Sequence, residues 1–256
     1  MDLHEWMIQG NHELIRYGTL PEERGKELVE RLLEGRNGGG DIWSPGETSR
    51  YPIFYIPPGP KGKKWKTVLG QVPKTQLFSA NMYELEILRL LCLLAPDREE
   101  VRRMRDKTLN RLRGTCFGYT DDGVGECFDV SLVVLRFLAI AAPEDSEWIL
   151  SRIDNYNRHR EEKKRPWFCL WYFWLCLSEL PFPLAQPEIE KYKGEMLNWL
   201  TNKSCVMHSE TDKTIHPVIL CMLRNTLARY PEYEYIKDRQ PYIDEKDGRL
   251  HFHMAR

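Results

Sequence analysis

The sequence predicts an all-α protein built from repeated helical hairpins, and three observations support this fold class. Four apolar runs each end at a proline, charged amphipathic segments follow prolines along the chain, and stretches with the pattern of a β-strand are few. The four prolines are separated by steps of 47, 38 and 50 residues: Pro96, Pro143, Pro181 and Pro231. A period of about 40–50 residues is the size of one helical hairpin repeat.

The apolar runs predict the inner helix of each hairpin. They cover residues 82–96, 128–143, 167–181 and 217–231, and a weaker fifth run ends at Pro21. Each run is apolar on most of its faces, which is typical of a helix that is buried on nearly all sides. Each should end before its proline, because the residue that precedes proline is driven out of the α region.

The charged segments predict outer helices that are half-buried. They cover residues 22–33, 97–112, 144–159 and 186–200. Acidic residues crowd the first turn of these segments, where they complement the helix dipole. In the second segment an apolar stripe runs along one face and Arg and Lys occupy the other; the stripe consists of Val101, Met104, Leu109 and Leu112.

Residues 36–80 interrupt the period and predict one long loop insertion. The insertion is rich in Gly and Pro, which cannot hold a helix. Within it, only residues 51–57 and 66–70 have an extended pattern. The polar and aromatic tail, 232–256, should wrap the last repeat. We therefore expect residues 1–256 to form a single α/α-repeat domain.

Composition narrows the classes of function. Apolar residues make up 42% and charged residues 29% of the chain, which is typical of a globular protein. The net charge of −1 argues against nucleic acid as the main partner. The most apolar stretch, 167–177, is much shorter than the ~20 residues that span a bilayer. With no apolar leader at the N-terminus, we expect a cytoplasmic protein with no membrane span.

Two glycine-rich, aromatic segments suggest a family. Residues 34–45 (EGRNGGGDIWSP) and 113–123 (RGTCFGYTDDG) each follow a predicted outer helix. This pattern, over about residues 20–230, resembles the α/α toroids of terpenoid cyclases and protein prenyltransferases. The resemblance implies concentric helices around a central cavity, here as a partial or small ring. The DxDD motif of the cyclases and the Asp-x-Cys zinc spacing of the prenyltransferases are both absent.

The densest cluster of candidate catalytic residues lies in residues 120–129, at the entry to a buried helix. Its carboxylates are Asp121, Asp122, Glu126 and Asp129. Crowding beside an apolar cavity would raise the pKa of a carboxyl group, which suits a general acid, and a pair of carboxylates could bind a cation. The alternative is structural, since Asp and Glu cap helix starts and Asp-Asp-Gly is ordinary turn chemistry.

Cys127 and His216 form a second candidate site, because each begins a predicted inner helix. They could supply a nucleophile or bind a ligand at one rim of a ring. A zinc site would need a further ligand, for which the candidates are Asp122, His208 and Asp212. Otherwise Cys127 is a small core residue and His216 a polar group at a helix entry. We therefore predict no metal site, and the sequence specifies no cofactor.

Aromatic side chains form the third candidate site. Trp167, Trp171 and Trp174 share one stripe of an inner helix, and Tyr172 lies on the next stripe. In a ring they could line the cavity and bind a cationic or aromatic ligand. Equally, such a stripe on a buried helix could be packed core.

Two functions follow from these patterns. The first is a toroid that binds or converts an apolar or aromatic small molecule in a central cavity, similar to a terpenoid cyclase. The second is a helical-repeat scaffold that binds another macromolecule and has no catalytic site. The sequence leaves both open, and with them the question whether the protein is an enzyme.

Overall fold

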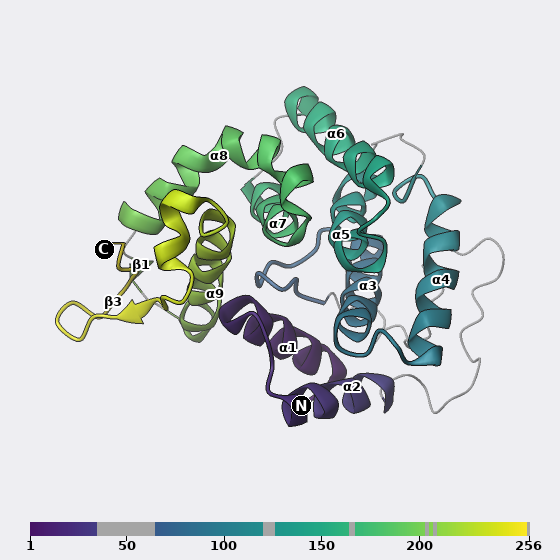
Figure 1. The fold of residues 1–256 in the computed structure, drawn as a ribbon, viewed down its shortest axis with the longest axis horizontal. Coiled ribbons are helices and arrows are strands. Elements are labelled where there is room, and N and C mark those ends of the chain that lie inside the picture. The colour runs from purple at the N-terminus through teal and green to yellow at the C-terminus, as the bar shows by residue number, and fades with distance from the viewer. Residues whose placement is uncertain (35–64, 120–125, 164–166, 203–204, 207–208, 255–256) are drawn as a thin grey trace.

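The computed structural model describes residues 1–34, 65–119, 126–163, 167–202, 205–206 and 209–254, and it is mostly helical (Figure 1). The predicted helical hairpins are confirmed. The helices are α1 (Leu3–Tyr17), α2 (Glu22–Glu34), α3 (Gln76–Leu94), α4 (Glu99–Arg113), α5 (Glu126–Ala141), α6 (Ser146–Lys163), α7 (Trp167–Glu179), α8 (Phe182–Asn202) and α9 (Glu210–Leu227), followed by the 3₁₀ helix η2 (Pro231–Ile236).

Helices of two kinds alternate along the chain. Each odd-numbered helix packs against the even-numbered helix that follows it: α1 on α2, α3 on α4, α5 on α6 and α7 on α8. The odd-numbered helices also pack on one another in sequence order, and α9 contacts α1 as well as α7. In Figure 1, α4, α6 and α8 accordingly lie outside α3, α5 and α7.

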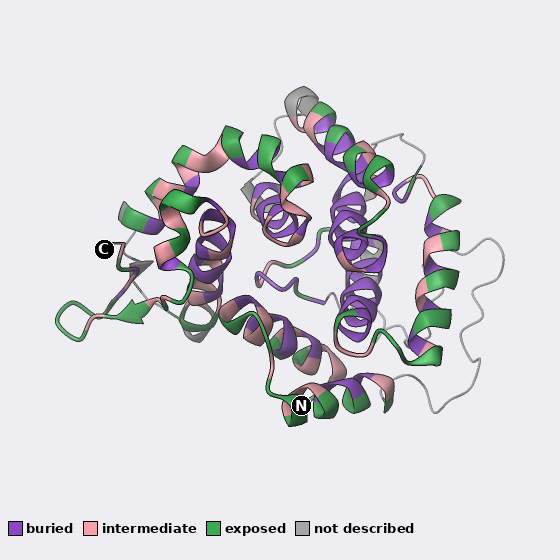
Figure 2. Cartoon of the chain, in the orientation of Figure 1, coloured by how far each residue is buried: buried purple, intermediate pink, exposed green. Residues whose placement is uncertain are grey.

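Burial follows the same division. Figure 2 shows α3, α5 and α7 buried around almost their whole circumference, whereas α2, α4, α6 and α8 are exposed along their outer faces. On α4, Val101, Met104 and Leu112 of the predicted stripe are buried and Leu109 is half-buried. The apolar faces therefore hold the outer helices onto the inner ones. In the part of the chain that is described, no helix is both long and apolar enough to cross a bilayer.

Polar contacts join α9 to the end of α1. The Arg224 guanidinium donates from Nη2 to the carbonyl of Arg16 at 2.8 Å, and the Asn225 amide donates to the carbonyl of Ile15 at 2.7 Å. The last carbonyls of a helix have no partner inside it, so these side chains satisfy groups that would otherwise need water. The first and last hairpins of the chain are thereby connected directly.

Two predictions of extended structure had different outcomes. Residues 51–57 lie outside the described residues. Residues 66–70 form a turn, in which Gly70 has φ 77° and its N–H donates to the carbonyl of Thr67. That φ value is the left-handed conformation that glycine adopts without strain.

A small sheet that the sequence analysis did not predict joins two strands of the tail to residues 205–206. Its strands are β1 (Cys205–Val206), β2 (Tyr242–Ile243) and β3 (Arg249–His251), in the order β1-β3-β2, and both pairings are antiparallel. Strands of two or three residues are too short to show an alternating pattern, which is why the sequence gives no signal for them.

Candidate functional site

Helix α1 has two edges with different surroundings. Along one edge Met7, Asn11 and Ile15 are buried in the core. Along the other, His4, Ile8 and Arg16 border an open groove. We call this the α1 groove. It has a volume of about 1260 Å³ and is completed by the start of α2, the segment 66–70 and the first turns of α9. Its lining residues outside α1 include Leu20, Pro21, Arg24, Lys66, Thr67, Gly70, Thr214 and Ile215.

Two histidines of α1 hold the segment 66–70 in place. His4 Nε2 lies 2.8 Å from the carbonyl oxygen of Lys66, and His12 Nε2 lies 2.7 Å from that of Val68. A carbonyl can only accept, so both imidazoles donate their Nε2–H. The segment therefore runs beside α1 and forms one wall of the groove.

Burial keeps His12 in its neutral form. Desolvation lowers its pKa below the ordinary value of 6.5, and the nearby charges of Arg16 and Arg136 lower it further, against the opposing effect of the bond to Val68. With its proton on Nε2, the neutral ring keeps Nδ1 as a hydrogen-bond acceptor.

An aromatic stack fixes the start of the same wall. The Trp65 ring stacks on Tyr83 of α3 with centroids 4.7 Å apart, and His4 packs on the same indole at 4.9 Å. Both Trp65 and Tyr83 are buried. The wall is thus anchored in the core and is not a surface loop.

The charges that line the groove are only partly paired. Arg24 donates to both carboxylate oxygens of Glu13 at 3.0 Å and to Glu27 at 2.9 Å, so its charge is fully balanced. Arg16 donates to the backbone carbonyl of Thr214 at 3.3 Å, and its buried Nε has no hydrogen-bond partner within the described structure. Lys66 is exposed at the rim. Glu5, the other carboxylate of the lining, lies 3.9 Å from the N-terminal amine. Among the described lining residues, the three cations Arg16, Arg24 and Lys66 therefore exceed the two carboxylates by one positive charge.

On the core edge of α1, four inner helices meet at a buried ion cluster. Arg136 of α5 lies at its centre and donates to Glu86 of α3 at 2.5 Å and to Glu179 of α7 at 2.8 and 2.9 Å. Arg89 of α3 pairs with Glu179 at 2.7 Å. The cluster contains two cationic and two anionic side chains, so its charges balance.

Neutral side chains complete this central ion cluster. The Asn11 carbonyl oxygen accepts from Arg89 at 3.2 Å and from Arg136 at 2.9 Å, and the Tyr172 hydroxyl donates to Glu86. Burial acts to raise the pKa of Glu179, but the charges of Arg136 and Arg89 outweigh it and the pKa is lowered. The cluster thus stays ionised inside the core, and Asn11 links it to α1.

The predicted acidic site is only partly described. Asp121 and Asp122 lie outside the described residues, and Glu126 begins α5, but its side chain is not described. Asp129 is buried on α5. The catalytic role of these four carboxylates therefore stays a prediction.

Cys127 and His216, the second candidate site, lie in different surroundings. Cys127 is half-buried, with its sulfur 3.1 Å from that of Cys116. His216 is half-buried on α9 with its Nε2 3.9 Å from an oxygen of Asp212, one of the predicted partners. The other two predicted partners, Asp122 and His208, lie outside the described residues.

The aromatic stripe divides between two locations. Trp171 packs edge-to-face on Trp174 at 4.9 Å and on Trp199 of α8 at 4.8 Å, so these rings lie between α7 and α8. Tyr172 joins the central ion cluster instead. Trp167 begins α7, and its side chain is not described.

The sequence analysis missed the cluster residues and the α1 groove. A signal for the cluster was present, because Glu86, Arg89, Arg136 and Glu179 are charged residues inside the apolar inner runs, as are Glu84, Asp129, Arg224 and Arg229. Charged side chains are almost never fully buried unless they are paired, so such residues predict partners in one another. The groove had no comparable signal, since its walls come from segments far apart in the chain.

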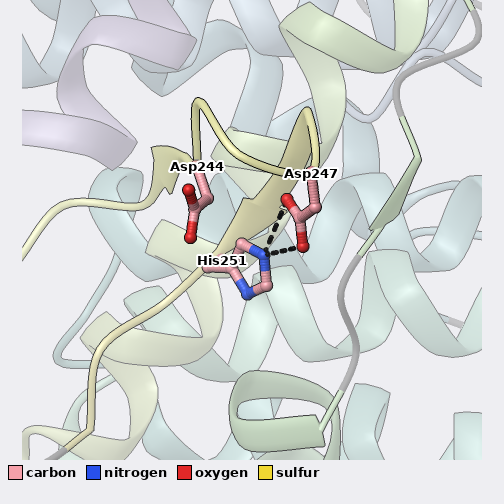
Figure 3. Close-up of side chains that lie close together, drawn as sticks. All are labelled: Asp244, Asp247 and His251. Carbon is pink, nitrogen blue, oxygen red and sulfur yellow. Dashed lines mark hydrogen bonds and ion pairs between the residues drawn. The ribbon is translucent and has the colours of Figure 1, made fainter.

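A third group lies at the hairpin of β2 and β3. Asp244, Asp247 and His251 point toward a common space in Figure 3, and their ligand atoms lie within 4.8 Å of one another. Side chains of these types could hold a divalent ion such as Zn²⁺. Each aspartate also accepts a backbone N–H of the turn, Asp244 from Lys246 and Asp247 from Arg249, so both have a structural role in the hairpin.

Comparisons with known proteins give no family. No protein-family model, curated protein sequence or solved structure matches the chain.

Proposed function

We propose that this protein is an α/α toroid that binds a small molecule with an apolar or aromatic body and an anionic group in the α1 groove. The toroid is supported by the series of contacts from α1 through α3, α5, α7 and α9 back to α1. The outer helices α2, α4, α6 and α8 pack outside that series. The resemblance to terpenoid cyclases and prenyltransferases agrees with this arrangement and stays a prediction.

One observation carries the ligand class: the groove combines apolar walls with uncompensated positive charge. Ile8, Leu20 and Ile215 offer apolar surface. The Arg24 charge is neutralised by Glu13 and Glu27, whereas Arg16 forms no ion pair with any residue that the structure describes and donates to the Thr214 carbonyl. A guanidinium in a partly desolvated site favours a carboxylate or phosphate partner. An apolar molecule that ends in such a group would complement both features.

The proposed site differs from the central cavity that the sequence analysis favoured. The central ion cluster lies between the inner helices, and its charges already satisfy one another. Replacing those contacts with a ligand would leave buried charges unpaired, at a cost of several kcal/mol. The groove can accept a ligand without that cost.

Isothermal titration calorimetry with three naphthalene derivatives tests the ligand class. 2-Naphthoate, 2-naphthol and 2-naphthylmethylamine share an apolar body and carry an anionic, a neutral and a cationic group. We expect saturable binding of 2-naphthoate, at least about tenfold tighter than that of the other two, because each tenfold corresponds to about 1.4 kcal/mol and one charge-assisted hydrogen bond supplies that much.

A matched pair of variants tests whether the α1 groove is the binding site. Ile8→Asp places a carboxylate in the groove, whereas Leu150→Asp places one on α6, where Leu150 is already exposed. We expect only the first to weaken 2-naphthoate binding. Equal binding of all three compounds would overturn the ligand class. Binding that survives Ile8→Asp would overturn the location, and no binding of any compound would favour the interaction scaffold.

A further inference from the structure

Two thiols meet where α4 leads into α5. Cys116 lies in the turn after α4, and Cys127 lies in the first turn of α5. Their sulfur atoms are 3.1 Å apart, and both side chains are half-buried. A disulfide has an S–S length of about 2.05 Å, so a movement of about 1 Å would bring these two sulfurs to bonding distance.

The turn that presents Cys116 is fixed by contacts that do not involve Cys127. The Trp148 indole donates to the carbonyl of Gly118 at 2.7 Å, and Arg152 donates to that of Tyr119 at 2.8 Å. A Cβ atom at Gly118 would lie 2.1 Å from the backbone oxygen of Leu112, so this position requires glycine. Helix α6 therefore holds the turn, and the closeness of the two sulfurs is built into the packing.

Three other cysteines whose side chains the structure describes have a different environment. Cys92, Cys176 and Cys221 are buried. Burial raises the pKa of Cys92 to about 12 and also raises the pKa of Cys176 and of Cys221. Because the thiolate is the reactive form, these three cysteines should resist oxidation near neutral pH.

We propose that Cys116 and Cys127 are a redox-active pair that forms a reversible disulfide on exposure to a peroxide. The thiolate of one cysteine attacks hydrogen peroxide, the O–O bond breaks, and a sulfenic acid and hydroxide form; the hydroxide takes up the proton that the thiol released on ionising and becomes water. The sulfur of the second cysteine then attacks the sulfenic sulfur, the S–S bond forms, and a second water leaves. The two thiols lose two electrons, which the peroxide gains.

The disulfide should stabilise the fold. It would join two residues separated by 11 positions, and closing such a loop removes conformational freedom from the unfolded chain. From the usual relation between loop length and stability, we expect the oxidised protein to melt about 5–10 °C higher than the reduced protein. Dithiothreitol should reverse the change.

Peptide mapping after peroxide treatment tests the pair. Residues 114–136 form one tryptic peptide, because no Lys or Arg lies between Arg113 and Arg136, and it contains both cysteines. After one equivalent of hydrogen peroxide and alkylation, we expect this peptide to be unalkylated and lighter by two hydrogens. Prior reduction should restore two alkylation sites.

Single substitutions provide the controls. Cys116→Ser and Cys127→Ser should each abolish both the mass change and the rise in melting temperature, whereas Cys92→Ala should leave both unchanged. The mass of the tryptic peptide can be measured whatever the melting temperature of the variant. The test therefore remains informative if one serine variant melts at a lower temperature. Full alkylation of the peptide after peroxide, a bridge to a different cysteine, or sulfinic acid without a bridge would overturn the proposal.

Discussion

The two edges of α1 differ in whether the charged side chains beside them are balanced by opposite charges. On the core edge, Asn11 accepts from two buried arginines whose charges are balanced by Glu86 and Glu179. On the groove edge, Arg16 donates to the neutral carbonyl of Thr214 and pairs with no carboxylate within the described ranges. A closed, balanced set of charges specifies how helices pack, whereas an open and unbalanced set is available to a ligand. Substitutions on the core edge should therefore change stability, and those on the groove edge should change binding.

The largest effect is expected at the centre of the ion cluster. Arg136→Met removes the cation shared by Glu86 and Glu179 and leaves two buried carboxylates with one arginine between them. We expect a loss of about 3–5 kcal/mol in the free energy of unfolding, measured by urea denaturation followed by circular dichroism. A loss below about 1 kcal/mol would show that the cluster does not specify the packing.

A smaller effect is expected at Asn11. Asn11→Leu keeps a similar volume but removes the acceptor that Arg89 and Arg136 share, which should cost about 1–3 kcal/mol. Because the side chain lies on the core edge, the affinity for 2-naphthoate should stay within about twofold of the wild-type value. A stable variant that had lost binding would contradict the separation of the two edges.

A pH dependence is expected from His12, and it should be the smallest effect. Burial lowers the pKa of His12 in the folded protein below 6.5, so below pH 6.5 the unfolded chain binds the proton more readily. The stabilising contribution is thus complete above that pH and is lost as the pH falls through the folded-state value. His12→Gln, whose amide can still donate to Val68, should flatten the stability profile between pH 7 and 5. An unchanged profile would show that His12 is not the titrating group.

Much of the fold could be predicted from the sequence because its signals are local. The inner helices end before Pro96, Pro143, Pro181 and Pro231, as expected from the conformational restriction that proline places on its predecessor. The turn at residues 66–70 was predicted wrongly as extended. Its geometry depends on His4 and His12, which lie more than fifty residues away in the chain.

The candidate site was harder to predict because its residues come from segments that are far apart in the chain. The charged residues of the inner runs signal buried pairs, but not which residues pair. Glu86 and Arg136 come from different hairpins, as do Arg89 and Glu179. The groove combines α1, α2, a turn and the start of α9, and no local pattern joins those segments. The β1–β3 pairing likewise joins segments that are more than forty residues apart, and no local pattern predicts it.

The central claim is that Arg16 supplies the positive charge that a ligand of the α1 groove recognises. The most direct test is the dissociation constant of 2-naphthoate, measured by calorimetry, for the wild-type protein, Arg16→Gln and Arg102→Gln. Arg102 is exposed on α4 and serves as the matched control. We predict a loss of about tenfold for Arg16→Gln, equivalent to about 1.4 kcal/mol, and no change for Arg102→Gln. Equal affinities for all three proteins would contradict the claim.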